Sequence, residues 1–187
     1  MAKSTAPHFH LEDKVIVITG AAQGIGAACA ERFAGDGATV ALWDVNDAPA
    51  NALAQMLSQR GQQAAAFHCD VSRKGDVDAA LAATLAAFGR VDALINNAGI
   101  FKAANFLDIS EADWDAVLGV NLKGAFLVAQ AVAREMVRAG KGGAIVHMSS
   151  VNSVLAIPNI ASYNVSKGGV NQLTRVMALA LAEHGIR

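Results

Sequence analysis

Short runs of apolar, β-branched residues alternate along the chain with longer segments in which apolar residues recur at helical spacing. The runs are bounded by Gly, Asp or Asn, which is typical of strands buried on both faces of a sheet. They predict five strands, at 14–19, 39–43, 63–68, 91–96 and 143–148. The helical spacing predicts five helices, at 24–33, 47–60, 76–88, 111–139 and 162–184, with Gly185 as the last C-cap.

Strand and helix therefore alternate five times, which indicates the class of fold. Parallel strands need long crossovers, and right-handed crossovers through helices give a doubly wound parallel sheet. We predict a single α/β domain of the Rossmann type over residues 11–187, preceded by a flexible N-terminal tail, residues 1–10. His8 and His10 flank Phe9 in that tail, and we interpret them as tail residues rather than a metal site.

The composition narrows the possible partners. Hydrophobic residues make up 53% of the chain and charged residues 17%, below the roughly 25% of an average domain, which excludes a disordered chain. A net charge of −1 offers no electrostatic footprint for nucleic acid or for an anionic membrane. The chain has two cysteines, no apolar signal region at its start and no uninterrupted apolar run of about 18 residues, so we expect a location in the reducing cytoplasm.

A glycine-rich loop follows the first predicted strand and opens the first helix. Glycines at such a turn let the backbone approach a pyrophosphate, to which the helix N-terminus presents free N–H groups. An ordinary tight turn can also require glycines, so the loop alone is weak evidence. Its position between strand and helix predicts cofactor contacts at Gly20, Gln23, Gly24, Ile25 and Gly26. The chain has no G-x-x-x-x-G-K-[ST] motif, which excludes a P-loop hydrolase.

Asp44 ends the second predicted strand, 18 residues after Gly26. An acidic residue there can accept hydrogen bonds from the adenosine ribose, and its charge repels a 2′-phosphate. Neither the loop nor the segment directly after Asp44 carries an Arg or Lys that would offset the repulsion. We therefore expect NAD(H) rather than NADP(H), the alternative being a solvated carboxylate at a strand end.

Tyr163 and Lys167 lie four residues apart on a predicted helix, so their side chains share one face. A free tyrosine, with a pKa of about 10, is a poor acid or base at neutral pH, and a neighbouring ammonium lowers that pKa. The two residues alone would fit a surface pair equally well. Ser150 favours the catalytic interpretation, because it ends the fifth strand at the sheet edge where open α/β folds bind ligands.

Together these motifs resemble the short-chain dehydrogenase/reductase family. The resemblance covers 11–187 and rests on the Gly-x-x-x-Gly-x-Gly loop, on Asn96-Asn97-Ala98-Gly99 after the fourth strand and on Tyr163-x-x-x-Lys167. It implies that Ser150, 13 residues before Tyr163, hydrogen-bonds the substrate oxygen while Tyr163 shuttles its proton. Lys167 would lower the tyrosine pKa and hold the nicotinamide ribose. Asn121 matches the family's fourth catalytic residue, which supports a water that links the lysine to bulk solvent.

The resemblance also implies contacts outside the catalytic set. Asp70 and Val71 are similar to the family's adenine-contacting pair, and Asn97, Ala98 and Gly99 to the stretch under the adenosine ribose. The alternative for Asn96 and Asn97 is a structural turn that caps strand ends, and the two roles are compatible. Residues that face the substrate in the family correspond to Phe101, next to Ile100, and to Asn152 and Asn159. Asn152 suits a polyol, sugar or hydroxy ketone, but it could equally cap its loop.

His147 and Cys29 are interpreted as structural residues, and no metal site is expected. The five histidines lack ligand-like spacing to Asp, Glu or Cys, so no metal is expected. His147 lies in the middle of a strand and is predicted to be a core histidine with its hydrogen bonds satisfied. Cys29 is predicted to be a buried packing residue.

The expected activity is hydride transfer between NAD(H) and a secondary alcohol or ketone, as in an NAD-dependent alcohol dehydrogenase or ketone reductase. A 3-oxoacyl-thioester reductase is the first alternative, and it would fit NADPH better than Asp44 allows. A non-enzymatic dinucleotide-binding module is the second, because the chain ends at Arg187, where the family continues with further strands and a substrate-covering segment. We expect the sequence to be part of a longer protein, and without that part its fifth strand would be an exposed apolar edge.

Two helices carry apolar faces, much of which should pack on the sheet, but the low charge count suggests more apolar area than one sheet needs. Val128, Val132 and Met136 recur on one helix, and Val170, Leu173, Val176 and Met177 on the other. The family commonly forms tetramers through these two helices, so the resemblance implies a homo-oligomer, a tetramer or dimer.

Overall fold

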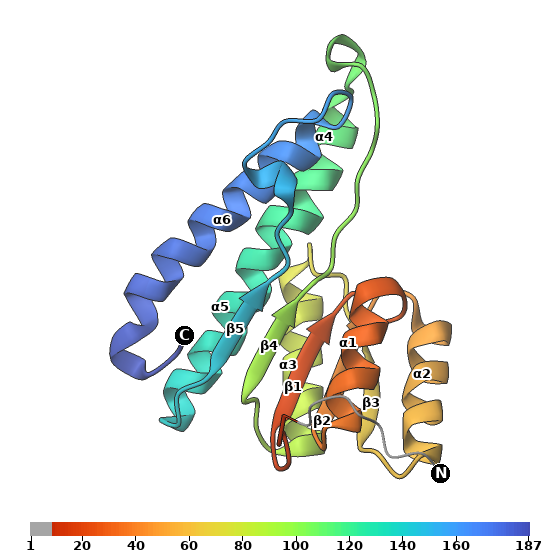
Figure 1. The fold of residues 1–187 in the computed structure, drawn as a ribbon, viewed down its shortest axis with the longest axis vertical. Helices are drawn as coiled ribbons and strands as arrows, with labels where there is room; N and C mark the ends of the chain where they lie inside the picture. The colour runs from red at the N-terminus through yellow and green to blue at the C-terminus, as the bar shows by residue number, and fades with distance from the viewer. Residues whose placement is uncertain (1–8) are drawn as a thin grey trace.

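The computed structural model describes residues 9–187, in which a five-stranded parallel sheet has helices on both faces (Figure 1). The strand order is β3-β2-β1-β4-β5. The strands are β1 (Val15–Thr19), β2 (Thr39–Asp44), β3 (Ala64–His68), β4 (Ala93–Asn96) and β5 (Ala144–His147). The predicted doubly wound α/β sheet is confirmed, and the order changes direction between β1 and β4, where such folds bind their ligands.

The predicted helices are all present, with small differences at their ends. They are α1 (Gly24–Gly35), α2 (Asp47–Gln59), α3 (Lys74–Phe88), α4 (Glu111–Leu118), α5 (Ala125–Ala139) and α6 (Ala161–Leu181). Short helical turns are η1 (Phe106–Asp108), η3 (Val151–Ser153) and η4 (Ala182–His184). Gly185 follows the last turn with φ +66°, in the left-handed conformation expected of a C-cap glycine.

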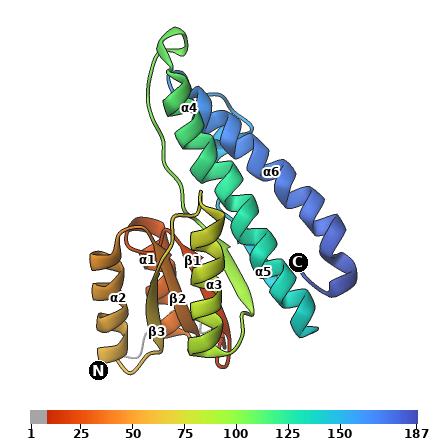
Figure 2. The same ribbon diagram turned by 180° about the vertical axis from the view of Figure 1, so that it is seen from behind.

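One long helix runs from α4 into α5 through a π-helical turn, η2 (Gly119–Gly124). A π turn widens a helix locally and is frequent at functional sites. By length and composition, residues 111–139 could cross a membrane, but half of the most apolar window is buried within the fold, and buried core helices pass the same test. Figure 2 shows α5 lying beside α3 and α6.

Two apolar layers fill the space above and below the sheet. Successive residues of a buried strand point to opposite faces, so Ile16 and Ile18 of β1 pack with α1 and α2, while Val17 packs with α3 and α5. Trp43 is fully buried on the second side, where its indole N–H donates to Thr84 Oγ1 at 2.9 Å. Both faces of the central strands are thus covered, as their continuous apolar pattern predicts.

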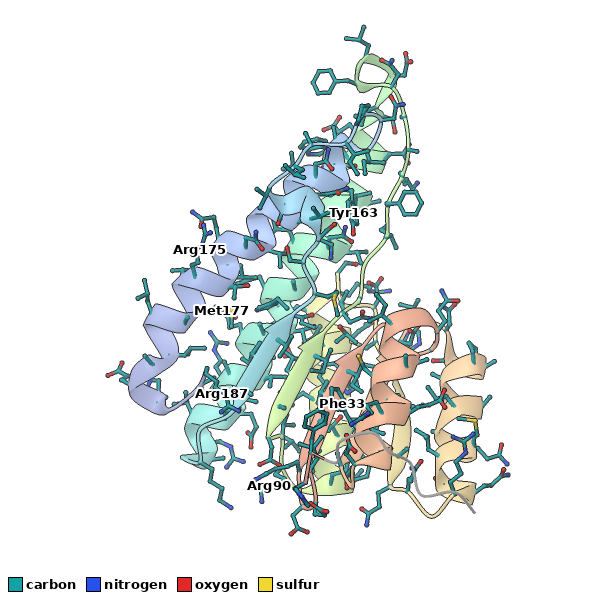
Figure 3. The ribbon with its side chains drawn as sticks, in the orientation of Figure 1. Phe33, Arg90, Tyr163, Arg175, Met177 and Arg187 are labelled. Atoms are coloured by element: carbon teal, nitrogen blue, oxygen red, sulfur yellow. The ribbon has the colours of Figure 1, made fainter. Side chains whose placement is uncertain are left out.

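The outer edge of β5 is partly paired, which differs from the fully exposed edge expected from the sequence. Ile186 forms a parallel bridge with Gly143, and the Ile145 N–H donates to the Arg187 carbonyl at 2.8 Å. Figure 3 shows Arg187 beside β5. Val146 on this strand is still 49% exposed.

The predicted flexible tail lies mostly outside the described residues. Of its ten positions the structure describes Phe9 and His10, and the Phe9 ring lies under the Arg32 guanidinium, 4.9 Å from the ring centroid.

Candidate active site

A cavity of about 620 Å³ opens at the carboxyl ends of the strands. Its size lies in the usual range of ligand clefts, about 300–1,000 Å³. Residues from the glycine loop, from all five strand ends and from α6 border it: Gly20, Gln23, Gly24, Ile25, Asp44, Val45, Asn46, Cys69, Asp70, Val71, Asn97, Ala98, Gly99, Ile100, Phe101, Val120, Met148, Ser149, Ser150, Tyr163 and Lys167. The cleft thus brings together most of the site residues that the sequence predicts.

The glycine loop is shaped by two close backbone approaches. Gly20 has φ +64°, and its N–H donates to the Trp43 carbonyl at 2.8 Å. At Gly26, a Cβ atom would lie 2.1 Å from the Gly20 carbonyl oxygen, so a side chain there cannot fit without moving the loop. The first turn of α1 has no side-chain cap and no acidic residue. Its N-terminus can therefore bind an anionic group, such as a pyrophosphate, in the cleft.

The carboxylate of Asp44 is held in place at one end of the cleft. Its Oδ2 accepts the Ala22 N–H at 2.9 Å, and its Oδ1 accepts the Asn46 N–H at 2.9 Å and side-chain amide at 3.2 Å. Asp44 is 7% exposed. Among the described residues that border the cleft, the only Lys or Arg is Lys167, which lies at the other end of the site. The lining of the cleft therefore offers no cation beside Asp44 to receive a 2′-phosphate.

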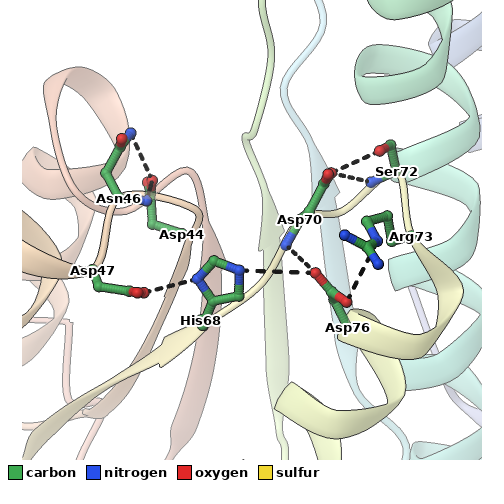
Figure 4. Close-up of polar contacts among 8 residues, drawn as sticks. All are labelled: Asp44, Asn46, Asp47, His68, Asp70, Ser72, Arg73 and Asp76. Carbon is green, nitrogen blue, oxygen red and sulfur yellow. Dashed lines mark hydrogen bonds and ion pairs between the residues drawn. The ribbon is translucent and has the colours of Figure 1, made fainter.

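Asp70, the first residue of the predicted adenine pair, lies within a network of acidic side chains (Figure 4). Asp70 Oδ1 accepts the N–H and the hydroxyl of Ser72, and the Asp70 N–H donates to Asp76 Oδ2 at 3.3 Å. His68 links the starts of α2 and α3, since its ring nitrogens lie 2.9 Å from Asp47 Oδ1 and 3.9 Å from Asp76 Oδ2. The hydrogen bond that His68 donates to the Asp47 carboxylate raises the pKa of His68.

The turn after β4 is bonded to the end of β1. Thr19 Oγ1 accepts the backbone N–H groups of Asn97 and Ala98, each at 3.0 Å. The Asn97 side-chain amide donates to the carbonyls of Thr19 at 3.0 Å and Gly20 at 3.2 Å. These bonds fix the floor of the cleft at the point where the strand order reverses.

Tyr163 and Lys167 come together at the other end of the cleft. Figure 3 shows Tyr163 on α6, beyond the carboxyl end of β5. Lys167 Nζ lies 5.5 Å from the Tyr163 ring centroid and donates to the Met148 carbonyl at 2.6 Å. Lys167 is only 4% exposed, and burial lowers its pKa. A desolvated ammonium interacts more strongly with an anion nearby than a solvated one does.

Ser150 and Ser149 both border the cleft but form different contacts. The Ser150 hydroxyl accepts the Asn152 N–H at 3.2 Å, whereas the Ser149 hydroxyl donates to Asn171 on α6 at 2.8 Å. The Ser150 hydroxyl therefore keeps its own proton and a second lone pair for a ligand oxygen.

Asn121 lies in the π turn, beside the cleft rather than on its surface. It is 2% exposed, and its Oδ1 accepts the Ile100 N–H at 2.8 Å. Its Nδ2 donates to the Ile100 carbonyl at 2.8 Å and to Ser166 Oγ at 3.0 Å. The side chain thus holds the β4 turn against α6, while its neighbour Val120 borders the cleft.

The three substrate candidates are separated by the structure. Phe101 borders the cleft and its ring meets Tyr163 edge-on, with centroids 6.5 Å apart. Asn152 is buried, and Asn159 is exposed with φ +65°; neither belongs to the residues that border the cleft. The loops after β4 and β5 are joined by the Ala104 N–H, which donates to the Asn159 carbonyl at 2.9 Å.

Two predictions about buried residues need correction. The Nδ1 atom of His147 lies 3.3 Å from the Asn96 amide, but its Nε2 is buried without a hydrogen-bond partner among the described residues, so this histidine is not fully satisfied. The side chains that share a small pocket with it are mostly apolar, and Thr174 there donates its hydroxyl to the Val170 carbonyl. Cys29 is half-buried rather than buried, because α1 has only one face on the sheet.

Sequence reasoning did not single out several residues that border the cleft, among them Cys69, Met148 and Val120. Cys69 directly follows β3 and Met148 directly follows β5, so their place at strand ends was the available signal. Burial, with smaller effects from Asp76, Asp70 and Asp44, raises the pKa of the Cys69 thiol to about 12.

A parallel sheet with this cleft and this Tyr-Lys pair defines a dinucleotide-binding α/β protein of the dehydrogenase type. Residues 14–187 match the short chain dehydrogenase family, and the chain belongs to the short-chain dehydrogenase/reductase family. It is therefore related to oxidoreductases, and its relatives bear the names of dehydrogenases and reductases.

Two curated relatives illustrate the similarity. The D-threitol dehydrogenase of Mycolicibacterium smegmatis is 42% identical over 179 residues, which is 96% of this chain and 68% of the relative. The NAD-dependent glycerol dehydrogenase of Listeria innocua is 37% identical over 178 residues, covering 95% of this chain and 68% of the relative. A solved short chain dehydrogenase/reductase from Burkholderia phymatum, in complex with NAD, has a TM-score of 0.91 and 34% identity, over 95% of this chain and 64% of that one.

Proposed function

We propose that this chain transfers a hydride between NAD(H) and a secondary alcohol or ketone, with a polyol, sugar or hydroxy ketone as substrate. The observation that carries the proposal is one continuous cleft in which Asp44 stands at one end and Ser150, Tyr163 and Lys167 stand at the other. The names of the threitol and glycerol dehydrogenases support a polyol substrate. Asn152 no longer supports it, because this residue does not border the cleft.

The residues of the cleft suit a nicotinamide dinucleotide along its length. The α1 N-terminus would bind the pyrophosphate, Asp44 the adenosine ribose, the Asp70–Val71 pair the adenine, and Lys167 the nicotinamide ribose. When bound, nicotinamide supplies the hydride donor or acceptor at its C4 atom. The fixed Asp44 carboxylate and the lack of a cation beside it in the cleft lining favour NAD(H) over NADP(H), which also weighs against a 3-oxoacyl-thioester reductase.

The proton path belongs to the protein. The Ser150 hydroxyl donates a hydrogen bond to the substrate oxygen and holds it near Tyr163, which gives that oxygen a proton or takes one from it. Lys167 Nζ, buried and 5.5 Å from the Tyr163 ring centroid, places a positive charge beside the residue that exchanges the proton. Asn121 holds the β4 turn and α6 together, so that Lys167 and the nicotinamide end of the cleft keep their relative position. Phe101 would contact the substrate beside Tyr163.

Replacement of one hydroxyl tests this proposal. Tyr163→Phe keeps the ring against Phe101 but removes the proton donor, so kcat should fall by at least about 100-fold, the usual lower bound for general acid–base catalysis. The Kd for NADH, measured by fluorescence titration, should stay within about twofold, because the hydroxyl is at one end of a long cleft. A variant that keeps the wild-type rate would show that Tyr163 is not the proton donor. NADH binding without turnover of any polyol or ketone by the wild type would favour a binding module.

The proposed function also includes a homo-oligomer located in the cytoplasm, as expected from the sequence. An apolar groove of about 370 Å³ lies between α5 and α6, bordered by residues such as Phe126, Val137 and Val176, which are 42%, 38% and 58% exposed. A second copy of this chain is the proposed occupant, because the groove runs along two adjacent helices that a two-fold axis could pair with themselves. Light scattering that gives a monomer at micromolar concentration would contradict it.

A further inference from the structure

The segment that carries Ser150 leaves the sheet at the border of the cleft, after Met148. The last backbone bond between β5 and its neighbour is the Met148 N–H, which donates to the Asn96 carbonyl at 2.9 Å. Beyond Met148, the described residues of β4 offer Ser149 and Ser150 no ladder partner. The place of the Ser150 hydroxyl therefore depends on contacts other than the sheet.

Two side chains of α6 supply those contacts. Lys167 Nζ donates to the carbonyl of Met148, two residues before Ser150, at 2.6 Å. One helical turn further on, Asn171 uses both atoms of its amide. Its Oδ1 accepts the Ser149 hydroxyl at 2.8 Å, and its Nδ2 donates to the Ser153 hydroxyl at 2.7 Å.

Ser153 passes this restraint on to Ser150. The Ser153 hydroxyl accepts from Asn171 and donates to the Ser150 carbonyl at 2.6 Å, and the Ser153 N–H donates to the same carbonyl at 3.0 Å. Donors and acceptors match at every bond of the network. Asn171 thus fixes the residue before Ser150 and the residue three positions after it, from a helix that also carries Tyr163.

We propose that Asn171 is a positioning residue that sets the place of the Ser150 hydroxyl relative to Tyr163. Asn171 does not border the cleft, so it acts through Ser149 and Ser153 and not by contact with substrate or cofactor. The side chain must offer one acceptor and one donor a fixed distance apart. Aspartate offers two acceptors and leucine offers neither. The inference rests on the proposed function, since it assigns Ser150 to the substrate oxygen.

The first test compares Asn171→Leu with a matched change at the next position. Gln172→Leu makes a similar amide-to-leucine replacement on an exposed part of α6, where the Gln172 side chain accepts a hydrogen bond from Arg175. Asn171→Leu should lower kcat by about 10- to 100-fold, the scale expected when a reacting group is displaced by up to an ångström. The Kd for NADH should stay within about twofold of the wild type. Gln172→Leu should leave both values unchanged.

A double-mutant cycle separates positioning from a general weakening of the fold. If Asn171 acts through Ser150, the loss caused by Asn171→Leu should largely disappear in a Ser150→Ala background, because no hydroxyl remains to be positioned. An equal loss in both backgrounds would overturn the proposal. Asn171→Asp keeps the acceptor for Ser149 and removes the donor to Ser153, so its effect should lie between those of wild type and Asn171→Leu.

Hydrogen exchange gives a readout that needs no substrate. The N–H groups of Asn152 and Ser153 donate to Ser150 Oγ and to the Ser150 carbonyl, so both should exchange faster in Asn171→Leu and not in Gln172→Leu. Unchanged exchange would show that Asn171 does not hold this segment, whatever the activity. If the wild type turned over no alcohol or ketone, the proposed function would fail, while faster exchange in the variant would still establish the restraint on Ser150.

Discussion

The carboxylate of Asp44, at the end of β2, accepts the backbone N–H of Ala22 in the glycine loop after β1, at a distance of 2.9 Å. One side chain therefore ties together the two parts of the cleft that would hold the adenosine ribose and the pyrophosphate. Asn46, two residues later, holds the other carboxylate oxygen. The orientation of the Asp44 carboxylate is thus fixed, and the residue is almost fully buried.

Asp44→Asn should change which dinucleotide binds. An amide carries no charge to repel a 2′-phosphate, and with one oxygen instead of two it cannot accept both the Ala22 and the Asn46 N–H groups. We expect NADH to bind about 10-fold more weakly, since a hydrogen bond to a charged group contributes roughly 1.5–3 kcal/mol. The preference for NADH over NADPH should shrink by a similar factor, measured by fluorescence titration of both. The control is Asp47→Asn, since Asp47 is an exposed carboxylate that pairs with His68. This variant should leave the preference for NADH over NADPH unchanged. Tighter binding of NADPH than NADH by the wild type would refute the cofactor proposal.

Gly26→Ala should disrupt the glycine loop. The added Cβ would lie 2.1 Å from the Gly20 carbonyl oxygen, which is backbone and cannot rotate away. We expect loss of NADH binding and a fall in the free energy of unfolding of about 1–3 kcal/mol, as for other overpacked sites. Gly75→Ala, in the first turn of α3, is the matched control. No atom of the described residues outside α3 lies within 4 Å of the place that a Cβ would take at Gly75, so alanine should be neutral or stabilise α3 by up to about 1 kcal/mol. Normal NADH binding by Gly26→Ala would show that the loop has room to move.

The sequence predicts the sheet better than it predicts the loops. The β-branched runs around Val17 and Leu42 are typical of central strands, so the fold, the strand ends and the place of Asp44 follow from local pattern. Ser150 is expected to end the fifth strand, but β5 ends at His147, so the strand pattern places Ser150 only near the edge of the sheet. Asn152 and Asn159 follow Ser150 in a loop whose course is set by hydrogen bonds to α6 and to Ala104. Such contacts join residues far apart in sequence, so no periodicity reveals them. For the same reason the part played by Asn171 is visible only in the structure.

His147 makes a separate prediction about acid stability. Burial, with a smaller effect from Lys167, lowers its pKa from the ordinary 6.5 to about 4. Between these values the unfolded chain takes up a proton on His147 and the folded chain does not. This residue therefore costs no stability above about pH 6.5, and the free energy of unfolding falls progressively as the pH drops to about 4, by roughly 3 kcal/mol at most.

Chemical denaturation of the wild type and His147→Asn between pH 4 and pH 7 measures this effect. Asparagine does not titrate and can still accept a hydrogen bond from the Asn96 amide, so the variant should lose less stability than the wild type as the pH falls. His68 is present in both proteins, and its raised pKa, which favours the folded state at low pH, cancels in the comparison. Both proteins contain the same carboxylates and the same other histidines, so the difference between their free energies of unfolding reports His147 alone. A difference that does not change with pH would mean that His147 is protonated equally in the folded and unfolded chains.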